Sequence, residues 1–254
     1  MTIIPVSIIM AFCDRPTFQN TLIGWSNLDY PDYEFVFVDN GSNKIEQYKK
    51  MIDEFGETHK VKYMCFSSAK NLNIAWNTGY TLATGDFIIF AMQDEIVSNK
   101  QVLHHMINEY IGTRVNILPY HLTTEWTQLM DTVDWKNNPE LLETFPGFYS
   151  SRIALNFTRT SATVLSNITG QYRKDWDWFG LFRNHEQGYL WIDQDVAMRE
   201  ACLKKIPITA KGVKCYHQAH KVSGTATYYE LAHSGYIYNT EREARLLDPA
   251  IGVQ

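Results

Sequence analysis

The sequence lacks several features that define whole classes of protein. None of its apolar runs approaches the roughly 20 residues of a membrane-spanning helix; the longest, residues 3–12 and 87–92, have the length of strands. Basic residues are fewer than acidic ones, 23 against 28, and the net charge of −5 lacks the excess of positive charge that phosphate contacts require. The first residues show neither the basic region nor the cleavage pattern of a signal peptide. We therefore expect no transmembrane segment, no nucleic-acid partner and no secretory route.

Cysteine is also scarce, and the cysteines are spaced too far apart to suggest a metal site. The four cysteines lie far apart and form no C-x-x-C pair: Cys13, Cys65, Cys202 and Cys215. This spacing fits neither a zinc site nor a disulfide framework. We therefore expect four reduced thiols in a cytoplasmic protein.

What is present is an apolar content of 45% and a regular alternation of two kinds of segment. Short apolar runs predict strands at residues 6–12, 34–38, 61–66 and 86–91. The segments between them predict helices at residues 17–28, 43–55 and 71–84, two of which end at a glycine. Strand and helix repeated three times indicate βαβ units and a three-layer α/β fold.

The regular alternation of strands and helices ends after Asp94, and the elements expected beyond it are more varied. A capping-box sequence at residues 98–101 predicts a helix to residue 111, followed by a strand at 114–118. Residues 120–149 show no periodicity and are expected to form an irregular functional loop or lid. Further strands are predicted at 152–157, 162–165 and 208–216, and helices at 193–203 and 228–247.

Polar residues follow the strands, at the edge where open α/β sheets bind their ligands. Asp14 follows the first strand, Asp39 ends the second, and Asp94 and Glu95 follow the fourth. No glycine-rich dinucleotide fingerprint or P-loop accompanies them. If phosphates bind here, a divalent metal held by these carboxylates would neutralise them.

Four segments in the correct order resemble family 2 glycosyltransferases with the GT-A fold. They are residues 6–15, 35–42, 73–90 and 191–199, and the resemblance covers roughly residues 3–220. It implies a Rossmann-like three-layer α/β/α sandwich with a mixed central sheet. It also implies an inverting transfer of a sugar from a nucleotide-diphosphate donor to an acceptor hydroxyl, with a saccharide or glycan as acceptor.

The resemblance places nucleotide binding at the first two strand ends. Asp39 would accept a hydrogen bond from the imide N–H of uracil or thymine, which favours a UDP- or dTDP-type donor and leaves guanine open. The other implied nucleotide-binding residues are Ala11, Asp14, Arg15, Asn40, Ser42, Asn73, Asn77 and Gln93. From the residues alone, Asp39-Asn-Gly-Ser is also a good turn sequence, and the two asparagines of the third helix also suit helix capping.

The metal-binding segment of the family is altered in this chain. Met92 stands where the first aspartate of the DXD motif usually stands, and a thioether is a poor ligand for Mn²⁺ or Mg²⁺. The resemblance leaves Asp94 as the metal ligand, with Glu95 available to restore the lost charge through water. His217, and less readily His220, would complete the site. The alternatives are a solvated acidic turn and a structural histidine.

The resemblance places the catalytic base at Asp193, with Asp195 as second choice. Both positions also suit the start of a helix, where carboxylates cap the backbone and complement the helix dipole. Trp178 and Trp191 are expected to stack their rings on an acceptor sugar, and Asp195 is also expected to contact the acceptor. The alternative for the two tryptophans is a hydrophobic seam that closes the sheet. Lys221 is expected to contact the diphosphate, although an exposed lysine needs no such role.

These expectations amount to a single domain over residues 1–254. The nucleotide half spans residues 1–95, the acceptor and catalytic half spans 96–225, and a helical tail follows at 226–254. Two other functions stay open. A sugar nucleotidyltransferase shares the fold, but its glycine-rich first loop is missing from residues 11–16. A catalytically silent sugar-nucleotide-binding protein would explain Met92, and Ile192 in place of the usual glutamate before the base.

Overall fold

The computed structural model describes residues 2–117, 119–122, 124–145, 147–149, 168–182 and 207–219, together with residues 196, 199, 200, 203 and 205. Its main element is a seven-stranded sheet in the order β10-β6-β9-β4-β1-β2-β3. These strands are β1 (Val6–Phe12), β2 (Tyr33–Asp39), β3 (Val61–Cys65), β4 (Phe87–Met92), β6 (Val115–Ile117), β9 (Ile168–Tyr172) and β10 (Ile208–Thr209). β9 runs antiparallel to both of its neighbours, and the other pairs are parallel. The predicted mixed α/β sheet is confirmed.

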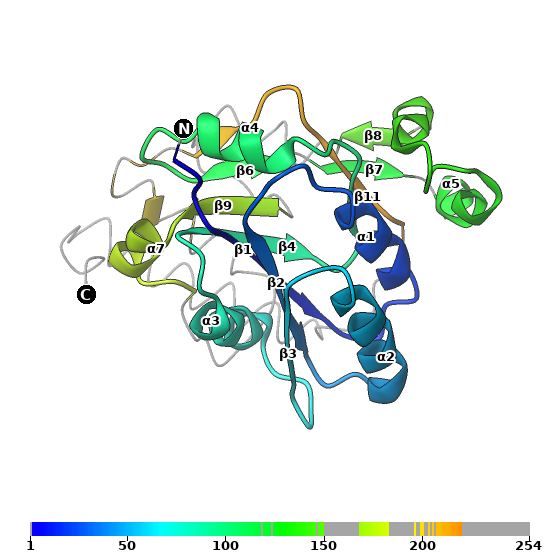
Figure 1. Ribbon diagram of the computed structural model, residues 1–254, viewed down its shortest axis with the longest axis horizontal. Helices are drawn as coiled ribbons and strands as arrows, with labels where there is room; N and C mark the ends of the chain where they lie inside the picture. Colours follow the sequence, from blue (N-terminus) through cyan, green and yellow to red (C-terminus); the bar gives the residue numbers. More distant parts are fainter. Residues whose placement is uncertain are drawn as a thin grey trace, which may run out of the picture.

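Helices cover both faces of this sheet. On one face α1 (Phe18–Trp25), α2 (Ile45–Gly56) and α4 (Val102–Asn108) pack on alternate residues of β1, such as Ile8 and Met10. On the other face α3 (Leu72–Leu82) and α7 (Arg173–Phe179) pack on Ile9 and Phe90. Figure 1 shows α1 and α2 on one side of β1–β3 and α3 on the other. Because both faces are covered, the central strands carry apolar residues on both faces, and these residues form nearly continuous apolar runs in the sequence.

A second, four-stranded sheet in the order β5-β11-β7-β8 lies beside α1 (Figure 1). Its strands are β5 (Glu95–Val97), β7 (Pro119–Leu122), β8 (Gly147–Tyr149) and β11 (Cys215–His217). The short helices α5 (Thr124–Leu129), η1 (Met130–Thr132) and η2 (Pro139–Thr144) belong to the same region. Ile96, Trp135, Leu142 and Tyr216 form a third buried cluster there. The irregular loop predicted at residues 120–149 is therefore wrong, because this segment has strands and a core of its own.

Other expectations for the second half need correction. The strand predicted at 208–216 is two strands, β10 and β11, separated by a turn in which Gly212 has φ +71°. β5, β9 and α7 were not predicted. The helix expected over 98–111 is the shorter α4, and the side chain of Asn99 accepts a hydrogen bond from the Gln101 amide before it begins.

Several expectations fall on residues that the structure does not describe. These are the strands at 152–157 and 162–165, the helix at 228–247 and most of the helix at 193–203, of which residues 196, 199 and 200 are helical. Within the described ranges, no helix combines the length and the apolar character needed to cross a membrane.

Candidate active site

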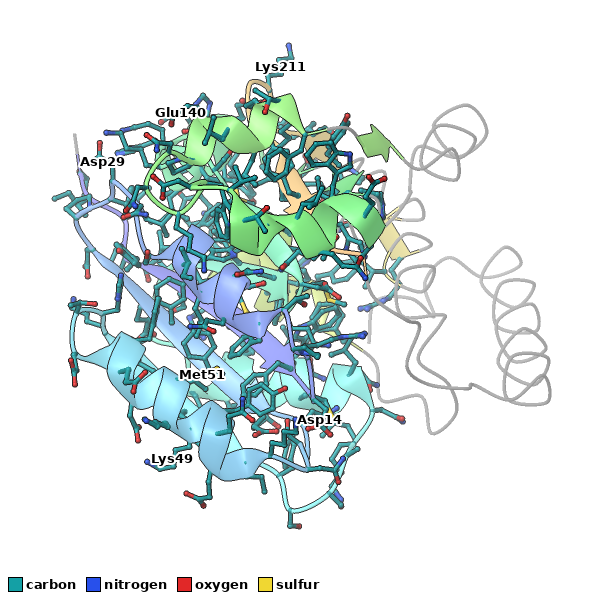
Figure 2. The ribbon with its side chains drawn as sticks, turned by 90° about the vertical axis from the view of Figure 1, so that its right-hand side faces the viewer. Asp14, Asp29, Lys49, Met51, Glu140 and Lys211 are labelled. Atoms are coloured by element: carbon teal, nitrogen blue, oxygen red, sulfur yellow. The ribbon has the colours of Figure 1, made fainter. Side chains whose placement is uncertain are left out.

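The carboxyl ends of β1, β2 and β4 meet at one edge of the large sheet because these strands are parallel neighbours. Figure 2 shows Asp14 at this edge and Asp29 towards the opposite one. Hydrogen bonds join the three strand ends. The Cys13 amide donates to Gln93 Oε1 at 2.6 Å, and the Asp14 amide donates to Ser42 Oγ at 3.1 Å. The three segments that carry expected nucleotide-binding residues are therefore joined at this edge.

Asp14 occupies an unusual backbone conformation. Its φ of +42° is uncommon for any residue other than glycine, and such strain is held only where neighbours fix it. Its carboxylate accepts hydrogen bonds from the Asn43 amide at 3.0 Å and from Asn43 Nδ2 at 2.6 Å. The loop after β1 is thus clamped onto the start of the segment after β2.

Asp39 is fully buried at the end of β2. Its Oδ1 accepts a hydrogen bond from the Ser42 amide at 2.8 Å, and its Oδ2 accepts one from the Tyr63 hydroxyl at 3.3 Å. Burial, followed by the charge of Asp39, raises the pKa of Tyr63. The side chain therefore forms the turn that the sequence suggested, and it does so at the edge where the nucleotide is expected.

The residues after Asp39 bring a second loop against this turn. Asn40 Nδ2 donates to the Lys70 carbonyl at 2.9 Å, and the Lys70 amide donates back to Asn40 Oδ1 at 2.8 Å. Gly41 makes this approach possible, because a Cβ there would lie 2.3 Å from the Ala69 amide nitrogen. Its φ of +79° also lies in the left-handed region that favours glycine.

Replacing Gly41 by alanine is expected to lower the free energy of unfolding by more than the roughly 1–2 kcal/mol of a left-handed conformation alone, because the new methyl group meets backbone. Chemical denaturation measures the loss. Gly112→Ala is the matched control, since Gly112 has φ +87° and no atom of the described residues lies within 4 Å of the place its methyl group would take. Equal losses in the two variants would contradict the proposed close approach.

The two asparagines of α3 have different surroundings. Asn73 is buried, and Asn77 binds the chain after α7, donating from Nδ2 to the Phe182 carbonyl at 2.7 Å and accepting from the Phe182 amide at 3.3 Å. The helix begins after Asn71, so neither residue is its N-cap and the capping alternative is wrong. Ala11, another expected nucleotide-binding residue, lies within β1 and packs in the core between β2 and β4.

Asp94, Glu95 and His217 form a compact cluster next to these strand ends. One ligand atom from each lies within 4.8 Å of the others. His217 Nδ1 lies 2.7 Å from Glu95 Oε1 and 3.7 Å from Asp94 Oδ1. Arg15 Nε lies 3.8 Å from Asp94 Oδ2 on the other side. Two buried carboxylates and an imidazole are donors that suit Mn²⁺, and the set therefore fits a divalent cation.

The charge state of His217 follows from its carboxylate neighbours. Burial lowers the pKa of His217, but the hydrogen bond to Glu95 and the charges of Glu95 and Asp94 outweigh burial and raise the pKa to about 8. The ring is therefore protonated at neutral pH, and a metal that binds it must displace a proton.

Two residues that lie near the cluster were not identified from the sequence. His121, on β7, places its ring centroid 4.7 Å from that of His217. Gln218 is fully buried; its amide donates to the Asp94 carbonyl at 3.0 Å and its Nε2 donates to Thr21 Oγ1 at 3.1 Å. Neither residue carries a recognisable motif, and His121 fell in the segment expected to be irregular.

The structure does not bring every expected residue to this cluster. Trp178 is 55% exposed, and its ring lies 5.3 Å from Lys205 Nζ, which donates to the Gly112 carbonyl ahead of β6. Trp178 therefore lies near the amino-terminal end of β6, whereas the cluster lies at the carboxyl ends of the strands. The expected residues Asp193, Asp195, Trp191, His220 and Lys221 lie outside the described residues.

Solved structures with the same architecture include a mannosyltransferase and the protein TarS. The mannosyltransferase PcManGT from Pyrobaculum calidifontis, in complex with GDP-Man and Mn²⁺, superposes with a TM-score of 0.64 at 16% identity over 99% of this chain and 65% of that one. S. aureus TarS 1–349 with UDP gives 0.64 at 17% identity, over 93% of this chain and 65% of TarS 1–349. The complex of TarS 1–349 with UDP-GlcNAc gives 0.62 at 17% identity, over 88% and 61%. This chain thus spans less than two thirds of the length of these neighbours.

The sequence comparisons give the family. No individual curated protein matches the chain significantly. The family described as glycosyl transferase family 2 matches residues 7–144, which contain β1 to β4 and the segment with Asp94 and Glu95. Together with the mixed sheet and its GT-A neighbours, this match shows that the chain belongs to glycosyl transferase family 2 and has the GT-A fold.

Proposed function

We propose that this protein transfers a sugar from a nucleotide-diphosphate donor to a hydroxyl of an acceptor saccharide, with inversion at the anomeric carbon. The observation that carries the proposal is the cluster of Asp94, Glu95 and His217 beside the strand ends of a family 2 chain. The neighbours named above are complexes with GDP-Man and Mn²⁺, with UDP and with UDP-GlcNAc. A UDP- or dTDP-type donor is favoured here because the carboxylate of Asp39 is an acceptor for an imide N–H.

Asp94 and His217 would hold the Mn²⁺ or Mg²⁺ ion. When bound, such an ion neutralises the diphosphate and stabilises the charge that develops on it as a leaving group. Arg15, 3.8 Å from Asp94, adds a fixed positive charge at the same edge. Lys221 is proposed to contact the diphosphate as well.

Asp193 is proposed as the general base. It takes the proton of the acceptor hydroxyl as that oxygen forms its bond to the anomeric carbon, and the bond from this carbon to the diphosphate oxygen breaks. The proton ends on Asp193 and the bonding electrons leave with the nucleotide diphosphate. Trp191, Trp178 and Asp195 are the residues proposed to hold the acceptor.

A catalytically silent sugar-nucleotide-binding protein is the second candidate. Met92 favours it, because this residue ends β4 where the family usually has the first aspartate of its metal motif. Both candidates bind the donor, so a transfer and hydrolysis assay separates them. Product formation supports the enzyme, and tight donor binding without turnover supports the silent protein.

Donor binding is expected to raise the melting temperature of the chain. A ligand at one hundred times its Kd stabilises the native state by about 2.7 kcal/mol. For a chain of this size that corresponds to a rise of roughly 5–10 °C. UDP, dTDP and GDP and their sugar conjugates are screened with and without Mn²⁺, and the largest rise is expected for a uridine or thymidine diphosphate with Mn²⁺.

Two variants test whether the Mn²⁺-dependent rise in melting temperature comes from the cluster of Asp94, Glu95 and His217. Asp94→Asn should remove the Mn²⁺-dependent part of the rise. Asp29→Asn should retain it, because Asp29 lies towards the opposite edge of the sheet (Figure 2). An unchanged melting temperature with every nucleotide would overturn the proposed function.

A further inference from the structure

Three polar side chains lie side by side on one rung of the small sheet. His217 on β11 is the register partner of Glu95 on the antiparallel strand β5. It is also the register partner of His121 on the parallel strand β7. Since side chains alternate along a strand, these three residues share one face of the sheet. Ile96 and Tyr216, one position away, belong to the buried cluster on the other face.

The contacts within this rung fix the ring of His217 from two sides. Glu95 Oε1 lies 2.7 Å from Nδ1, and the ring of His121 packs at a centroid distance of 4.7 Å and an interplanar angle of 53°. Because Glu95 holds Nδ1, a metal bound by this ring would be bound through Nε2. Because a ring turned over would place a carbon against the carboxylate, this contact also selects one ring orientation.

Glu95 is itself held rigidly. Its side chain is fully buried, and its carbonyl accepts a hydrogen bond from Trp25 Nε1 at 3.1 Å. The residue before it, Asp94, is tied by its carbonyl to the amide of Gln218, which directly follows His217. These bonds fix the backbone that carries the buried carboxylate of Glu95. A carboxylate on such a backbone is suited to orient a neighbouring imidazole, as carboxylates behind metal-binding histidines do.

We propose that Glu95 is a positioning residue that orients His217 through Nδ1, so that Nε2 of His217 and the carboxylate of Asp94 bind the metal directly. His121 supports the same orientation by ring packing and not as a ligand. This inference rests on the proposed metal-dependent sugar transfer and assigns separate roles to the two adjacent acidic residues.

The first test measures Mn²⁺ affinity of the full chain without donor, from the paramagnetic signal of free Mn²⁺. Glu95→Ala is expected to weaken binding by about 10–100-fold, the usual effect of removing an orienting partner. His121→Phe keeps a ring in place and should leave the affinity unchanged. Glu34→Gln is the control. Glu34 is also a buried, hydrogen-bonded glutamate, but it lies near the amino-terminal end of β2, away from the cluster at the carboxyl ends of the strands.

The second test identifies the nitrogen of His217 that binds the metal. Long-range ¹H–¹⁵N spectra of the chain loaded with diamagnetic Cd²⁺ should show the proton on Nδ1 and the metal on Nε2. A metal on Nδ1 would displace the hydrogen bond between Nδ1 and Glu95 and would contradict the orienting role. The measurement uses the unaltered chain, so it stays decisive even if Glu95→Ala does not fold.

The outcomes separate the inference from the function on which it rests. Failure of the unaltered chain to bind Mn²⁺ would overturn both. If the unaltered chain binds Mn²⁺, three results would overturn the inference alone: unchanged affinity in Glu95→Ala, a metal on Nδ1, or a loss in His121→Phe as large as that in Asp94→Asn.

Discussion

Replacing Asp193 by asparagine is expected to lower the turnover number for sugar transfer by about 10²–10⁴-fold, the usual contribution of a positioned general base. Asparagine has nearly the same shape but cannot accept the proton of the acceptor hydroxyl at neutral pH. The donor should still bind, because the proposed nucleotide and metal residues lie on other segments. The experiment compares turnover under saturating donor with the Kd of the nucleotide diphosphate.

Asp195→Asn is the matched control for this variant. Asp195 lies two residues further along the chain and was the second choice for the base. Because Asp195 is proposed to hold the acceptor, its replacement should raise the KM for the acceptor and change the turnover number little. A large loss in Asp195→Asn together with unchanged turnover in Asp193→Asn would move the base to Asp195 and refute the assignment.

Removing the buried guanidinium of Arg114 is expected to cause the largest loss of stability. Arg114 Nε and Nη2 lie 2.6 and 2.8 Å from the two carboxylate oxygens of Glu200, and both side chains are almost fully buried. Its Nη1 donates to Asn116 Oδ1 and Thr169 Oγ1, both at 3.0 Å. Arg114→Met leaves the Glu200 carboxylate buried without its partner, which costs about 3–5 kcal/mol. The melting temperature should fall by roughly 6–20 °C.

The double variant Arg114→Met with Glu200→Leu distinguishes a stranded charge from lost packing. Well-packed apolar residues often replace a buried ion pair without loss. Asn116 and Thr169 also retain their own hydrogen bond of 2.7 Å in this variant. The double variant should therefore recover most of the stability. A double variant less stable than Arg114→Met would refute the explanation by charge.

The elements of the first 95 residues could be predicted from the sequence because their signals are local. β1, β2 and β4 are strands of six or seven residues built around apolar runs, and the helices between them are long enough to show their ends. Of the small sheet, β5, β8 and β11 have three residues each, too short for any periodicity. Their pairing depends on partners far away in the chain.

β9 was missed for a different reason. Its sequence, Ile-Thr-Gly-Gln-Tyr, is polar for a strand buried between β4 and β6. Gly170 is required there because a Cβ would lie 2.8 Å from the ring of Phe87, and Thr169 bonds to Arg114 and Asn116. The need for a glycine and for a hydrogen-bonding side chain at these positions comes from neighbouring strands, so no local sequence pattern predicts it.

The candidate site was anticipated in part. The family resemblance named Asp94 and His217, and the structure brings them together; their role as metal ligands stays a prediction. The direct contact of Glu95 with His217 and the neighbouring ring of His121 were not anticipated. Both depend on the register of β5, β11 and β7, which no motif encodes.

The pairing of β11 with β5 has a consequence for the order of folding. The Glu95–His217 contact joins residues 122 positions apart, so it forms only after a long loop has closed. Loop-closure entropy opposes such contacts early in folding, whereas β1 to β4 assemble through shorter connections. We therefore expect the Rossmann-like half to acquire its structure first and the proposed cation site to be completed last. Recovery of Mn²⁺ affinity during refolding would then lag behind recovery of helical circular dichroism, and a chain ending before β11 would have the nucleotide edge without the cation site.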